Sequence, residues 1–222
     1  MGDRMTPEPE NRLTVAIIGA GPLGRSLAWR AARAGFRVLL EDVLPSNLHQ
    51  ARRFIRSELE AQKMAGAAEN PAAVPNRDAT PGPLPLDSSP TPAPEEAFAV
   101  AFVSSIEDAV RSAELVIECV PDELESKLEI LWLLDRMAPP HAVFATPTTA
   151  LSIADLAACT NRPGQCVALA AAPAALARLE SGDALELRTT PATTPGTVAL
   201  VDRFWRALGF NPVFRPAPQE PL

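Results

Sequence analysis

Residues 13–24 read Leu-Thr-Val-Ala-Ile-Ile-Gly-Ala-Gly-Pro-Leu-Gly, an apolar run that ends in a glycine-rich turn. The run 15–18 is typical of a buried parallel strand, and an Ala-rich helix that ends at Gly35 is expected to follow the turn. The glycines have the G-x-G-x-x-G spacing that brings a dinucleotide pyrophosphate to a helix N-terminus. The residues predicted to contact the cofactor here are Gly19, Gly21, Pro22, Leu23 and Gly24. The alternative is a tight turn without a nucleotide in another kind of α/β protein.

An acidic residue follows the second apolar run of the chain. The run 38–40 ends at Glu41 and Asp42, and Asp42 lies 18 positions beyond Gly24. A carboxylate at this distance accepts a hydrogen bond from the adenosine ribose 2′-hydroxyl and repels a 2′-phosphate. Asp42 therefore predicts NAD rather than NADP as the cofactor.

The composition of the chain limits the classes of partner. Its 222 residues carry a formal net charge of −7, and 47% of them are hydrophobic. This acidity argues against nucleic acid or an anionic membrane as a partner, and no apolar run is long enough to span a bilayer. The three cysteines, Cys119, Cys159 and Cys166, lack the spacing of metal ligands and are typical of a reducing compartment. We expect a soluble, cytoplasmic protein without a metal site.

Strand-like and helix-like segments alternate along the chain, which predicts a doubly wound, mostly parallel, Rossmann-like α/β sheet in a single domain. Further strands are expected at 100–103, 115–120, 142–145, 166–171, 184–187 and 212–214, and further helices at 43–64, 106–112, 122–137, 151–158 and 196–208. The domain is expected to span 13–215, between a flexible N-terminus at 1–12 and a tail at 216–222.

One internal segment departs from this composition. Residues 65–97 are rich in Ala and Pro and poor in large apolar side chains, so they are predicted to form a flexible insertion that cannot order itself by burial. Binding of a partner by this segment is the alternative interpretation.

Three segments, in the same order along the chain, resemble the NAD-binding domain of the 3-hydroxyacyl-CoA dehydrogenases. They are Ala-Glu-Leu-Val-Ile-Glu-Cys-Val-Pro-Asp-Glu-Leu-Glu-Ser-Lys at 113–127, Leu-Ser-Ile-Ala-Asp-Leu-Ala at 151–157 and Thr-Thr-Pro-Gly-Thr-Val at 193–198. The resemblance implies NAD as the cofactor and a role in fatty acid metabolism. It places Asp122 at an acidic position near the cofactor and Lys127 at a lysine near the nicotinamide. A surface pair with Glu123, one helical turn away, is the alternative for Lys127.

The resemblance is weakest at the catalytic positions. Thr149 has a hydroxyl group where the family has a serine that contacts the substrate, and Glu186 falls at the glutamate that orients the catalytic histidine. That histidine, the general base of the family, is replaced by Ala170. The two histidines of the chain, His49 and His141, are expected on the surface and away from the nicotinamide.

Three functions remain open at this stage. The first is an NAD(H)-binding relative of the family in which 3-hydroxyacyl-CoA oxidation is weak or lost. The family's C-terminal helical domain is expected to be absent, so an acyl-CoA or a separate protein is expected over the site. The second is an active NAD-dependent oxidoreductase that uses Lys127 and Thr149 on another substrate. The third is a Rossmann interaction module without enzymatic activity.

Overall fold

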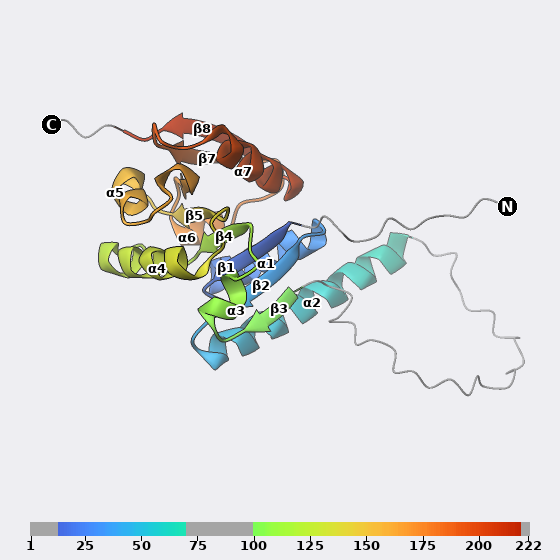
Figure 1. The fold of residues 1–222 in the computed structure, drawn as a ribbon. Helices are drawn as coiled ribbons and strands as arrows, with labels where there is room; N and C mark the ends of the chain where they lie inside the picture. The colour runs from blue at the N-terminus through green and yellow to red at the C-terminus, as the bar shows by residue number, and fades with distance from the viewer. Residues whose placement is uncertain (1–12, 70–99, 219–222) are drawn as a thin grey trace, which may run out of the picture.

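The computed structural model describes residues 13–69 and 100–218, which form an eight-stranded sheet with helices on both faces (Figure 1). The strand order is β3-β2-β1-β4-β5-β6-β7-β8, and every neighbouring pair is parallel except β6 and β7. The strands are β1 (Thr14–Ile18), β2 (Arg37–Glu41), β3 (Val100–Val103), β4 (Leu115–Glu118), β5 (Val143–Pro147), β6 (Cys166–Leu169), β7 (Ala184–Thr189) and β8 (Asn211–Pro216). The doubly wound, mostly parallel fold predicted from the sequence is confirmed.

The helices divide between the two faces of the sheet. They are α1 (Pro22–Arg33), α2 (Pro45–Glu69), α3 (Ile106–Val110), α4 (Leu124–Met137), α5 (Ile153–Ala158), α6 (Pro173–Leu176) and α7 (Pro195–Ala207), with a 3₁₀ turn at Pro163–Gln165. Buried side chains of α1, α2, α6 and α7 form one core cluster, and those of α3, α4 and α5 form the other. Figure 1 shows α7 together with β7 and β8 at one end of the molecule.

Strand β1 shows why the sheet has two cores. Its side chains alternate between the faces: Val15 and Ile17 belong to the α1 side, whereas Ala16 and Ile18 belong to the α4 side. All four are at most 2% exposed. A strand buried on both faces is the expected product of an apolar run without alternation.

The order of the strands positions the site. β1 lies between β2 and β4, so the chain continues from β1 toward one edge of the sheet and later returns to extend the other. At such a switch point the loops after β1 and β4 diverge and open a crevice at the carboxyl ends of the strands. The glycine turn begins at this crevice.

Several element boundaries differ from the sequence predictions. Helix α2 continues to Glu69, so residues 65–69, predicted as the start of the insertion, are helical. Strands β4 and β6 end at Glu118 and Leu169, two residues earlier than predicted, and the short helix α6 was not predicted. The predictions for 1–12, for the rest of the insertion (70–97) and for 219–222 lie outside the described residues.

Candidate functional site

The turn between β1 and α1 contains glycines that have distinct structural roles. Gly19 has φ of +101°, in the left-handed region that favours glycine. A Cβ atom on Gly24 would lie 1.8 Å from the carbonyl oxygen of Gly19, so only glycine lets α1 begin this close to the strand. A Cβ on Gly21 would meet no protein atom within 4 Å. The space beside Gly21 is therefore open to a ligand.

Helix α1 supplies the electrostatics of this turn. Gly21 is its N-cap and Pro22 occupies the first helical position, where proline's missing N–H group removes no helical hydrogen bond. The free N–H groups and the positive end of the helix dipole favour a phosphate here. Leu23 differs from its neighbours because its side chain is 4% exposed and packs in the core. Only the backbone of Leu23 is available to a cofactor.

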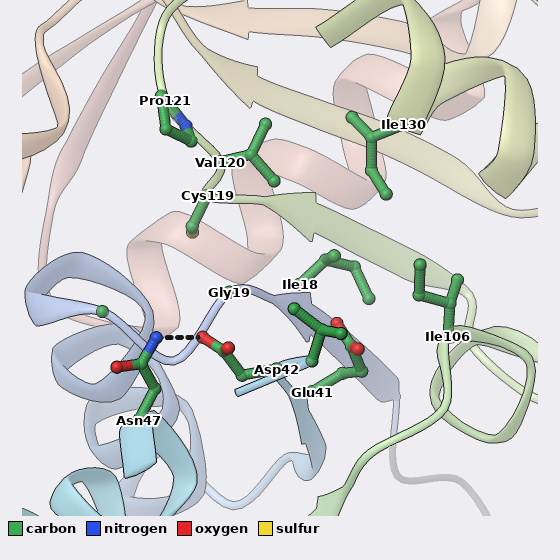
Figure 2. A pocket seen from close by; sticks show the side chains of 12 residues that line it. Ile18, Gly19, Glu41, Asp42, Asn47, Ile106, Cys119, Val120, Pro121 and Ile130 are labelled. Atoms are coloured by element: carbon green, nitrogen blue, oxygen red, sulfur yellow. Dashed lines mark hydrogen bonds between the residues drawn. The ribbon is translucent and has the colours of Figure 1, made fainter. Parts of the chain in front are cut away.

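Asp42 lies directly after β2 and is held by three hydrogen bonds. Its Oδ2 accepts from the Asn47 side chain (3.0 Å; Figure 2) and from the backbone N–H of Ala20 (2.8 Å). Its Oδ1 accepts from the N–H of Leu44 (2.8 Å). A carboxylate has about four lone-pair sites, so one site on Oδ1 stays available for a ribose hydroxyl. The role of Asn47 was missed from the sequence, and its position five residues after Asp42 is the signal that could have found it.

A pocket of about 330 Å³ opens at the switch point (Figure 2). Its polar part lies at Gly19, Gly21, Asp42 and Asn47. The other lining residues are Ile18, Glu41, Val43, Ile106, Cys119, Val120, Pro121 and Ile130. Burial raises the pKa of the Cys119 thiol, so this side chain stays neutral. A polar part beside an apolar part suits a nucleoside, which has a hydroxylated sugar and a flat base.

Asp122 lies in the loop between β4 and α4, on the other side of the crevice. Its Oδ2 accepts a hydrogen bond from the backbone N–H of Thr149 (3.0 Å), and Thr149 itself is exposed. Its Oδ1 is buried and accepts no hydrogen bond from the part of the chain that the structure describes. A buried acceptor without a partner costs free energy, and a sugar hydroxyl would supply the missing donor.

Lys127 is fully buried rather than on the surface of α4. Its Nζ donates to Glu118 Oε2 (2.8 Å) and lies 3.1 Å from Thr146 Oγ1, and Thr146 in turn donates to Glu118 (2.7 Å). Burial raises the pKa of Glu118, and the Lys127 ammonium opposes this effect. The alternative of an exposed pair with Glu123 is wrong, because the register of the sheet brings Glu118 beneath the helix.

Ala170 and Glu186 lie side by side on neighbouring strands. The N–H of Ala170 donates to the carbonyl oxygen of Glu186 (2.9 Å), just beyond the antiparallel pairing of β6 and β7. The Glu186 carboxylate forms ion pairs with Arg188 (3.3 Å) and Arg215 (3.6 Å). This carboxylate is thus directed to two guanidinium groups of β7 and β8.

The comparisons with known proteins agree with this geometry. A family model described as "3-hydroxyacyl-CoA dehydrogenase, NAD binding domain" matches residues 14–215. The chain belongs to this family. It is 30% identical over 206 residues to the mitochondrial hydroxyacyl-coenzyme A dehydrogenase of Sus scrofa, covering 90% of this chain and 57% of that protein. It is 28% identical over 157 residues to a probable 3-hydroxybutyryl-CoA dehydrogenase of Bacillus subtilis, covering 70% of this chain and 47% of that protein.

A solved structure shows the same fold. The (S)-3-hydroxybutyryl-CoA dehydrogenase of Ralstonia eutropha superposes with a TM-score of 0.71 at 20% identity, covering 94% of this chain and 65% of that one. The chain spans about half the length of the curated relatives described above.

NAD is the cofactor of this domain of the 3-hydroxyacyl-CoA dehydrogenase family, and the cleft has groups that fit each part of it. The open space at Gly21 fits the pyrophosphate, the remaining lone pair of Asp42 fits the adenosine ribose, and the unpaired Oδ1 of Asp122 fits a hydroxyl of the second ribose. NAD supplies a hydride acceptor when it is bound. These protein groups would hold and orient it, and Lys127 forms an ion pair with Glu118 beneath the loop that carries Asp122.

The described residues contain no group of three or more His, Cys, Asp or Glu side chains that could hold a metal ion. No helix among them is long and apolar enough to cross a membrane. His49 and His141 are exposed on α2 and before β5, as expected from the sequence.

Proposed function

We propose that this chain binds NAD(H) in the cleft at the switch point and oxidises or reduces 3-hydroxyacyl-CoA substrates weakly or not at all. The observation that supports weak turnover is Ala170. The resemblance aligns this residue with the family's general base, and it lies at the end of β6 beside Glu186. A methyl group moves no proton, and the loss of a general base costs about 100- to 10,000-fold in rate.

The charges around Ala170 support the same proposal. In the family the matching glutamate orients an imidazole, whereas Glu186 is paired with Arg188 and Arg215. These pairs are partly exposed, and they direct the carboxylate to the two guanidinium groups. Exposed His49 on α2 and His141 before β5 belong to other parts of the fold.

An active oxidoreductase that uses Lys127 receives less support. A group that exchanges a proton with a substrate must come within about 3 Å of it. The Lys127 side chain is 0% exposed, and its Nζ is held by Glu118 and Thr146. A substrate would have to displace this buried network before it reached the amine.

The second ligand in this proposal is an acyl-CoA thioester, or else a protein that covers the surface at the exposed Thr149 and the half-buried Ala170. The relatives named for hydroxyacyl-coenzyme A and 3-hydroxybutyryl-CoA support the thioester and a setting in fatty acid metabolism. The acidic charge and the free cysteines support a cytoplasmic setting.

Two measurements on the purified chain test the proposal. Isothermal titration with NADH should give saturable binding, and Asp42→Ala should weaken it, because the variant removes the carboxylate aimed at the ribose. Absorbance at the NADH band with acetoacetyl-CoA present should then show little or no oxidation. Rapid oxidation by the wild type would overturn the claim of weak turnover, and loss of that activity in a Lys127→Met variant that still binds NADH would favour the lysine mechanism. Absence of NADH binding would favour an interaction module.

A further inference from the structure

A second carboxyl group faces the nucleotide pocket beside Asp42. Glu41 is the last residue of β2, is 4% exposed and lines the same pocket as Asp42. Successive strand residues point to opposite faces. Asp42 points toward Ala20 and Asn47 on the α1 side, so Glu41 points toward the face covered by α3 and α4, where Leu39 is buried.

The surroundings of Glu41 are apolar. Its neighbours in register are Ile18 on β1 and Val103 on β3, and Figure 2 shows it between Asp42 and Ile106. Ile130 of α4 closes the same part of the pocket. Within residues 13–69 and 100–218, no group donates a hydrogen bond to the Glu41 carboxyl or forms an ion pair with it.

Such a carboxyl group is costly to the fold unless a ligand satisfies it. Burial raises the pKa of Glu41 to about 7, and the negative charge of Asp42 adds to this effect. Glu41 faces β1, β3, α3 and α4, and the side chains of these elements that line the pocket are aliphatic. Asp42 is therefore the charged group that acts on Glu41. The cost is removed when a hydrogen-bond donor enters the pocket.

We propose that Glu41 recognises the base of the bound dinucleotide: its carboxyl group accepts a hydrogen bond from the exocyclic amino group of an adenine that packs against Ile106 and Ile130. The inference rests on the cofactor role of the cleft. When Asp42 holds the ribose, the attached base lies in the adjoining apolar part of the pocket, where Glu41 is the polar side chain. The amino group is the only hydrogen-bond donor on the adenine of a nucleotide.

The test compares NADH with its reduced purine analogue, a dinucleotide in which a hydrogen atom replaces the amino group of the adenine. At pH 8, isothermal titration of the wild type should show about tenfold tighter binding of NADH, because the carboxylate gains a donor from adenine and none from the purine analogue. In Glu41→Leu the two affinities should agree within about twofold. Glu41→Gln should keep a preference for NADH, since its amide oxygen can accept the same hydrogen bond.

Glu107→Gln is the matched control, because Glu107 is an exposed carboxylate of α3 next to Ile106 and does not line the pocket. It should keep the tenfold preference, and thermal unfolding should confirm that every variant is folded. Equal affinities in the wild type, or a preference that survives in both Glu41 variants, would overturn the assignment and leave the cofactor site intact. Failure of the wild type to bind either nucleotide would overturn the cofactor site and the assignment together.

Discussion

Glu41 and Glu118 occupy equivalent places in the sheet and have opposite environments. Each ends its strand, β2 or β4, in register with Ile18 of β1, and they are 4% and 1% exposed. Glu118 accepts hydrogen bonds from the Lys127 ammonium and from Thr146. Glu41 has Asp42 beside it and faces the nucleotide pocket.

The difference separates two uses of a buried carboxyl group. Lys127 and Thr146 satisfy Glu118 inside the protein, so that half of the crevice is a rigid support for the loop that carries Asp122. The group at Glu41 is left for a ligand to satisfy. Burial alone therefore does not show whether a carboxyl group has a structural role or binds a ligand. The presence or absence of a neighbouring cation distinguishes the two.

The largest effect should follow from removing that cation. Lys127→Met leaves Glu118 buried without its counter-charge, so the free energy of unfolding should fall by about 3–5 kcal/mol, measured by urea denaturation. The loss should grow as pH rises, because the folded state must then hold a proton on Glu118 that the unfolded state releases. The double variant Lys127→Met/Glu118→Gln is the control and should recover part of the loss. A change below about 1 kcal/mol would show that the pair contributes little.

The glycine turn on the adenosine side offers a matched pair of variants. Gly24→Ala places a Cβ 1.8 Å from the Gly19 carbonyl oxygen, so overpacking should lower stability by about 1–3 kcal/mol. Gly21→Ala meets no protein atom within 4 Å and should change stability by less than about 0.5 kcal/mol. It should nevertheless weaken NADH about tenfold or more, because its methyl group occupies the space for the pyrophosphate. Equal effects of both variants on stability would contradict the separate roles of Gly24 in packing and Gly21 in cofactor binding.

The titration of Glu41 should appear in the pH dependence of stability. Its pKa is raised to about 7 in the folded state, so its proton is bound more tightly there than in the unfolded chain. The stabilisation of the folded state by this bound proton is present at low pH and is lost as pH rises through about 7. Between pH 5 and 8 the stability of the wild type should fall relative to Glu41→Gln by about 1–2 kcal/mol, reduced from the full shift because the pocket is open to solvent. Parallel pH curves would show that Glu41 ionises normally.

The smallest effect is expected at Glu186. Its pairs with Arg188 and Arg215 are partly exposed, with the Glu186 side chain 40% exposed, so Glu186→Gln should change stability by less than about 0.5 kcal/mol. NADH affinity, measured by titration, should also stay within about twofold, because the residue lies away from the cofactor pocket. A tenfold change in NADH affinity would place Glu186 in the cofactor site.

The residues of the glycine turn show what local pattern can predict. Their spacing, the apolar run before them and the acid after the second strand were enough to predict the fold and the NAD site. Lys127 shows the limit, since its sequence neighbour Glu123 suggested a surface pair and its partner is Glu118, nine positions earlier. Asn47 was missed although it lies only five positions after Asp42, because the sequence does not show how the turn into α2 directs its amide.

The sequence by itself determined the family, the strand–turn–helix unit and the positions of Gly19, Asp42 and Ala170, because periodicity and spacing act over a few turns of the chain. Only the tertiary structure decided that Glu118 receives a lysine and that Glu41 receives no cation from the part of the chain that the structure describes. Those environments depend on which strand lies beside β1 and which helix covers each face. The charge and burial of a side chain are set by such distant neighbours, which no local spacing records.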